Sequence, residues 1–76
     1  MKTRNISNLP LVAYLSILGH KIIELNSSNE RTTFFIFEDS ESLEKATLNF
    51  YNRLGQVEPL AFSETLRSLK SMALKR

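Results

Sequence analysis

The sequence predicts an α+β fold in which a helix, a β-hairpin and two further helices follow one another along the chain. Three observations predict this fold: apolar residues recur at helical spacing in three segments, two strand-like segments flank a polar turn, and glycine or proline marks most boundaries. Seventy-six residues can build one hydrophobic core and not two. We therefore expect a single domain over residues 9–76, preceded by a basic, mobile arm at residues 1–8.

The first helix is expected from about Leu9 to Leu18. Asn8 supplies a capping side chain, Pro10 stands in the first turn, where a missing amide hydrogen costs nothing, and Gly19 suits the left-handed backbone that ends a helix. Apolar residues cover most of this helix, which predicts burial on more than one side. His20 follows the glycine directly and is expected to bond carbonyl groups at the end of the helix.

A β-hairpin is expected next, with strands at about residues 20–25 and 31–37 and a polar turn between them. Because side chains alternate along a strand, both faces of the second strand are apolar. A hairpin packed on helices from one side only would leave large apolar side chains in water, so a further helix or a second chain should cover the other face. The candidates for an oligomer interface are Phe34, Phe35, Ile36 and Phe37.

The second helix is predicted to begin after a cap at Asp39 or Ser40 and to continue to about Arg53, with Gly55 ending it. Four carboxylates lie close together at its start. Paired carboxylates can perform acid–base or metal chemistry, but acidic residues at a helix start are also favoured by the helix dipole and by capping. We interpret the cluster as structural; its members are Glu38, Asp39, Glu41 and Glu44.

The third helix is predicted to open at Glu58 and Pro59, again with proline in the first turn. Its apolar stripe consists of Phe62, Leu66, Leu69 and Ala73, with Met72 beside it. Between the second and third helices, Gln56 and Val57 are candidates for a short third strand at the edge of the hairpin.

The residue inventory argues against catalysis. There is no cysteine, one histidine and only two glycines, so thiolate chemistry, a two-histidine metal site and a glycine-rich phosphate loop are excluded for a single chain. We therefore expect a non-enzymatic protein without a cofactor, metal or small-molecule substrate. The longest apolar run is far shorter than the ~20 residues of a membrane span, so we expect a cytoplasmic protein with no membrane contact.

The charged residues are separated along the sequence. The net charge is +2, but residues 38–44 hold four acids and no base, and residues 65–76 hold four bases and no acid. Basic residues gathered on one side of a helix are typical of phosphate contacts in nucleic-acid binding. The candidate nucleic-acid-binding residues are Lys2, Arg4, Arg67, Lys70, Lys75 and Arg76.

Two functional classes remain open at this point. Basic residues in the last turns of a helix are also what the helix dipole favours, and no motif of a known DNA- or RNA-binding fold is present. The alternative to a nucleic-acid-associated or regulatory domain is a protein-interaction module acting as a homo-oligomer. This alternative rests on the two-faced aromatic strand, the apolar first helix and the separated charges, which a symmetric pair of chains could bring together.

Several segments carry a resemblance that covers about Leu9 to Met72. These segments are Leu11-Val12-Ala13-Tyr14-Leu15, Gly19-His20-Lys21, Phe34-Phe35-Ile36-Phe37-Glu38-Asp39, Phe50-Tyr51-Asn52, Val57-Glu58-Pro59-Leu60 and Leu66-Arg67-Ser68-Leu69-Lys70-Ser71. Together they resemble a family of short bacterial and phage proteins grouped as a domain of unknown function. The resemblance implies an association with mobile elements and so favours a DNA-related or regulatory role. It assigns no catalytic or binding residue.

Overall fold

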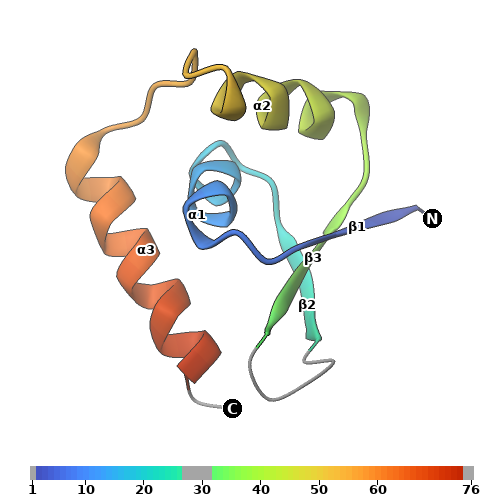
Figure 1. The fold of residues 1–76 in the computed structure, drawn as a ribbon, viewed down its shortest axis with the longest axis vertical. Helices are drawn as coiled ribbons and strands as arrows, with labels where there is room; N and C mark the ends of the chain where they lie inside the picture. The colour runs from blue at the N-terminus through green and yellow to red at the C-terminus, as the bar shows by residue number, and fades with distance from the viewer. Residues whose placement is uncertain (1, 27–31, 75–76) are drawn as a thin grey trace.

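The computed structural model describes residues 2–26 and 32–74, and it has the expected α+β architecture (Figure 1). A three-stranded antiparallel sheet lies on one side of a central helix, and two further helices lie beside and above that helix. The elements are β1 (Thr3–Ile6), α1 (Leu9–Ile17), β2 (Ile22–Asn26), β3 (Phe34–Glu38), α2 (Glu41–Tyr51) and α3 (Pro59–Leu74).

The sheet has the strand order β1-β3-β2, with β3 antiparallel to both neighbours. The β2–β3 hairpin is confirmed, and most of its expected turn lies outside the described residues. Two predictions were wrong. Residues 3–6 are not a free arm but an edge strand of the sheet, and Gln56 and Val57 belong to the α2–α3 connection without forming a strand.

β1 forms because β3 supplies its hydrogen-bonding partner. Alternation puts Arg4 and Ile6 on the face that looks toward the helices, opposite Phe37 and Phe35 respectively. Ile6 is buried in the core, and Arg4 reaches the start of α2. The segment has a single apolar residue, so its own sequence contains almost no strand signal. Its strand conformation is therefore set by pairing with β3, which is distant in sequence.

α1 is the centre of the core, as its apolar surface predicted. Five consecutive residues, 11–15, are buried, and α1 contacts α3, α2 and β1. Around it pack the remaining core side chains: Ile6, Phe35, Phe37, Leu43, Ala46 and Leu69. A helix surrounded in this way must be apolar on nearly every side, which accounts for its composition.

Both ends of α1 are capped as the sequence predicts. The Asn8 side-chain oxygen accepts a hydrogen bond from the Leu11 amide at 3.3 Å. At the other end Gly19 has φ 104°, and the backbone amide of His20 donates to the Leu15 carbonyl at 3.1 Å. This contact with the end of the helix comes from the His20 backbone amide and not from its side chain.

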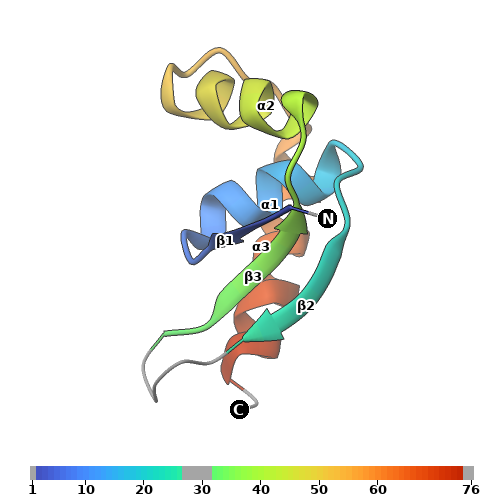
Figure 2. The same ribbon diagram turned by 90° about the vertical axis from the view of Figure 1, so that its right-hand side faces the viewer.

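The helices cover only one face of the sheet (Figure 2). Phe35 and Phe37 point into the core and are completely buried, so they are not interface residues. On the opposite face Ile36 is only 8% exposed, although no described helix covers it. Ile36 lies on the central strand, where Asn5 and Glu24 flank it as register partners. The covering element that the sequence suggested is therefore unnecessary for Ile36.

Candidate functional site

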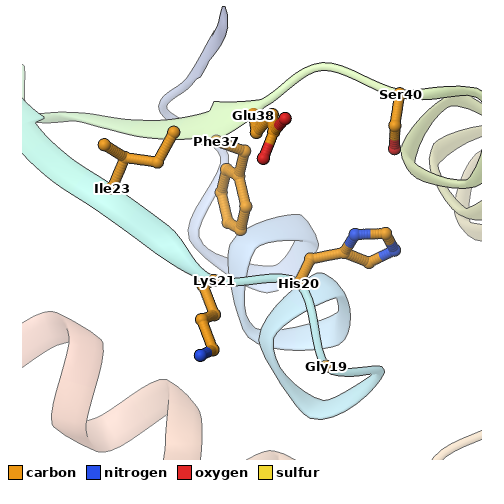
Figure 3. A pocket seen from close by; sticks show the side chains of 7 residues that line it. All are labelled: Gly19, His20, Lys21, Ile23, Phe37, Glu38 and Ser40. Carbon is orange, nitrogen blue, oxygen red and sulfur yellow. The ribbon is translucent and has the colours of Figure 1, made fainter.

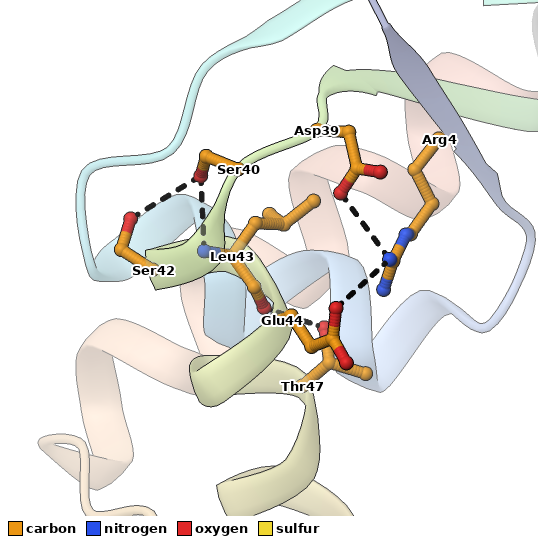
Figure 4. A network of polar contacts seen from close by, with 7 residues as sticks. All are labelled: Arg4, Asp39, Ser40, Ser42, Leu43, Glu44 and Thr47. Atoms are coloured by element: carbon orange, nitrogen blue, oxygen red, sulfur yellow. Dashed lines mark hydrogen bonds and ion pairs between the residues drawn. The ribbon is translucent and has the colours of Figure 1, made fainter.

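Arg4 of β1 lies at the acidic start of α2 (Figure 4). The Arg4 guanidinium is 3.2 Å from the Asp39 carboxylate and 3.7 Å from that of Glu44. The backbone amide of Asp39 donates to the Lys2 carbonyl at 2.9 Å, which brings Lys2 to the same place. Ser40, not Asp39, caps α2 by accepting from the Leu43 amide at 3.1 Å. Arg4 therefore pairs with two of the four carboxylates of the acidic cluster.

The other predicted phosphate contacts lie elsewhere. Arg67 and Lys70 are exposed, three residues apart on α3, and Leu69 between them is buried. Figure 1 shows β1 and α3 on opposite sides of α1. Lys75 and Arg76 lie outside the described residues. Among the described residues, the basic side chains of the amino-terminal strand and those of α3 are therefore not brought together on one surface.

Exposed large apolar side chains concentrate where α2 passes into α3. We call residues 48–62 the α2–α3 corner. Four of its side chains are more than half exposed: Leu48 (54%), Tyr51 (59%), Leu54 (69%) and Leu60 (63%). Elsewhere in the described chain, only Leu18, Ile23 and Met72 are large apolar residues classed as exposed, and each is less than half exposed. The sequence analysis did not predict this concentration of exposed apolar side chains, because it used apolar residues only to predict the buried faces of helices and strands.

The end of α2 has an unusual residue in its left-handed position. Arg53 has φ 62°, its amide donates to the Phe50 carbonyl at 3.2 Å, and the Leu54 amide donates to the Asn49 carbonyl at 2.9 Å. These two bonds form the Schellman motif, in which glycine normally takes the left-handed place. The prediction that Gly55 ends the helix was therefore wrong by two positions.

Gly55 is needed for a different reason. A Cβ atom at this position would overlap the Tyr14 hydroxyl and lie 2.6 Å from ring carbon Cε1. Only a residue without a side chain lets the α2–α3 connection pass this close to α1. The glycine thus sets the position of the connection against the core.

An aromatic recess of about 220 Å³ opens beside this contact. We use the name aromatic recess for the space lined by Tyr14, Phe50, Arg53, Gly55, Val57 and Phe62. The Tyr14 and Phe50 rings pack at 5.6 Å between centroids with a 44° tilt. α1, α2, the connection and α3 all contribute to the lining. Arg53 is the only charged residue among these lining residues.

Glu58 is near in sequence but its carboxylate has other partners. Its two side-chain oxygens accept from the Leu60 amide at 3.0 Å and the Ala61 amide at 2.7 Å, so Glu58 caps α3, which begins at Pro59 as predicted. These bonds lower the pKa of Glu58 below its ordinary value, since they favour the charged form. No described carboxylate forms an ion pair with Arg53. The Arg53 charge is therefore available to a ligand.

A larger recess of about 470 Å³ lies between the end of α1 and the start of α2 (Figure 3). It is lined by Gly19, His20, Lys21, Ile23, Phe37, Glu38 and Ser40. Figure 3 shows the Lys21 side chain directed away from the His20 ring, so the basic groups do not converge on one point. Within residues 2–26 and 32–74, no three His, Cys, Asp or Glu side chains are grouped so that they could hold a metal ion.

These features describe a small α+β domain built on a three-stranded antiparallel sheet, with an apolar corner beside an aromatic recess. The chain belongs to the DUF5659 family, a domain of unknown function, whose family model matches residues 1–75. This confirms the resemblance to a domain of unknown function. The searches of curated proteins and of solved structures found no match. Across the described helices, none is long and apolar enough to cross a membrane.

Proposed function

We propose that this domain is a protein-interaction module that binds an acidic, apolar segment of a partner protein at the α2–α3 corner. The observation that carries the proposal is that one short segment holds four large apolar side chains, each more than half exposed, and also contributes Arg53, which has no ion-pair partner in the described chain, to the lining of a recess. This develops the interaction-module alternative that the sequence left open.

Large apolar side chains held in water favour contact with another protein. Burying apolar surface yields roughly 25 cal/mol per Å², so leucine and tyrosine side chains held in water are available to stabilise a complex. An exposed apolar patch rimmed by polar residues marks an interaction site. The proposal therefore requires that the exposed side chains of the corner are buried together in the complex. Tyrosine and arginine, both present at the corner, are the residue types that dominate binding energy in interfaces.

A peptide selection followed by mapping tests the proposal. Peptides selected from a random library against the full chain would be titrated into ¹⁵N-labelled protein. We expect selected sequences to combine aromatic or leucine residues with carboxylates and to shift amide signals between residues 48 and 62. Leu54→Ser and Leu60→Ser should weaken binding, whereas the control Leu18→Ser, an exposed leucine at the end of α1, should not. Shifts confined to the open sheet face would overturn the proposal.

Sedimentation equilibrium determines whether the partner is a second copy of the chain. Association that rises with concentration and disappears in the Leu54→Ser and Leu60→Ser variants would identify a homo-oligomer at the corner. Association that persists in both variants would place the self-contact on another surface.

Nucleic-acid contact along α3 is a second candidate, favoured by one observation. Arg67 and Lys70 are both exposed and share a side of α3, with Ser71 also exposed beside them. Anisotropy of labelled duplex DNA, single-stranded DNA and RNA at two salt concentrations tests it. Phosphate contact predicts binding that weakens steeply with salt and further in Arg67→Gln, whereas Arg4→Gln should have no effect because Arg4 is paired with carboxylates. Absence of binding at low salt would exclude this candidate.

A further inference from the structure

We infer that the aromatic recess receives one aromatic side chain of the partner and that Arg53 pairs with a carboxylate adjacent to that side chain. The inference rests on the proposed function and specifies the chemistry of the partner. It concerns a site formed by four separate parts of the chain, with the Arg53 side chain as its only charged member.

The size of the recess indicates a single side chain. Pockets that enclose small molecules have volumes of about 300–1,000 Å³, and the recess has about 220 Å³. It is also open to solvent, so a polypeptide that passes over it could insert one residue. A cofactor-sized ligand would extend well beyond the lining residues.

The lining indicates an aromatic ring. Tyr14, Phe50 and Phe62 present ring surfaces, and Val57 completes the apolar part. Tyr14 and Phe50 already make a tilted pair, and Tyr51 stands edge-on to Phe50 at 5.4 Å between centroids. Rings prefer tilted and edge-to-face neighbours, so a further ring would extend this packing.

The charge at the recess indicates a carboxylate next to the ring. Arg53 has no ion-pair partner in the described chain. The carboxylate nearest to it in sequence, that of Glu58, is bonded to α3 amides. A guanidinium binds a carboxylate through two parallel hydrogen bonds, which fixes orientation as well as adding affinity. A lysine-rich partner would instead be repelled.

The backbone supports a role for the Arg53 side chain outside folding. Arg53 occupies a left-handed conformation that glycine adopts without steric cost and that a residue with a Cβ adopts at a cost. Within the described chain, the Arg53 side chain forms no ion pair that would offset this cost. Replacement by glycine should therefore leave the fold intact while removing the charge, which makes it an informative variant.

Fragment titration tests the inference with defined probes. We would titrate 3-phenylpropanoate into ¹⁵N-labelled full-length protein and compare its uncharged amide, 3-phenylpropanamide, and the cationic phenethylamine. We expect millimolar binding of the carboxylate, with shifts at Tyr14, Gly55 and Phe62, and affinity about tenfold or more above that of the amine. The Arg53→Gly variant should bind 3-phenylpropanoate no better than the other two probes. Its amide spectrum should remain that of a folded protein.

The possible outcomes separate the inference from the proposed function. Equal binding of the three probes, shifts away from the recess, or no shift at the highest soluble concentration would overturn the inference. If selected peptides bind the corner while the fragments do not enter the recess, the inference falls and the interaction surface remains. If the fragments enter and no peptide binds the corner, the proposed function falls.

Discussion

The backbone of Gly55 passes directly against the hydroxyl group of Tyr14, leaving no room for a Cβ atom. Tyr14 is itself buried on α1, so its ring cannot swing freely into solvent. This one contact positions the α2–α3 connection and forms one wall of the aromatic recess.

We expect Gly55→Ala to lower the free energy of unfolding by about 1–3 kcal/mol, because overpacking forces the ring or the backbone to move. Urea denaturation measures the loss. Gln56→Ala, at the exposed neighbouring residue, serves as the control and should change stability by less than about 0.5 kcal/mol. Equal stability of the two variants would mean that the close approach does not constrain the connection.

Arg53→Gly should stabilise the protein. Arg53 has a left-handed backbone conformation, and removing its Cβ atom relieves a steric cost of about 1 kcal/mol. The larger backbone entropy that glycine loses on folding offsets part of this gain. The matched control is Asn52→Gly, since Asn52 has φ −88° and gains nothing from glycine; it should destabilise. Thermal unfolding distinguishes the two. A destabilised Arg53→Gly would show that the arginine side chain has a structural role after all.

Ile6→Ala should cost about 2–4 kcal/mol, because Ile6 fills the core from β1 and is only 7% exposed. A mobile arm predicts a change within about 0.5 kcal/mol, so the measurement decides between the two descriptions of residues 3–6. Arg4→Gln should cost less than about 1 kcal/mol, since the ion pairs of Arg4 are partly exposed.

The α3 cap makes stability depend on pH through Glu58. Hydrogen bonds from Leu60 and Ala61 lower its folded pKa below its ordinary value of 4.5. A carboxylate whose pKa is lower in the folded than in the unfolded protein stabilises the folded state at pH values above the unfolded pKa. This stabilisation is lost as the pH falls through the folded pKa. In Glu58→Gln the difference in stability from wild type should therefore shrink below pH 4.5. A difference that stays constant with pH would contradict the cap.

The parts of the fold that were predicted correctly are those set by local chemistry. Asn8, Gly19 and Ser40 act within a few residues of their own position, so their caps could be predicted from sequence. β1 could not, because its strand structure comes from pairing with β3, about thirty residues away. The predicted fold class is nevertheless correct, because an additional edge strand does not change the α+β architecture.

The candidate site was harder to predict for two reasons. Tyr14, Phe50 and Phe62 come from three helices and meet only in the folded chain, so no spacing in the sequence marks the recess. Arg53 takes a position that sequence rules assign to glycine, and Gly55, two residues later, is required by Tyr14 instead. Conversely, the sequence predicted a nucleic-acid-binding role for Arg4, because the order of charges along the chain could not show that Arg4 pairs with Asp39 and Glu44.

The most direct test of the central claim is a calorimetric titration of one selected acidic–aromatic peptide into wild-type protein, Leu54→Ser and the control Leu18→Ser. The proposal predicts that Leu54→Ser weakens binding by about tenfold or more, equivalent to 1.4 kcal/mol, and that Leu18→Ser binds like wild type. Equal affinity for all three proteins would contradict the assignment of the α2–α3 corner as the interaction surface.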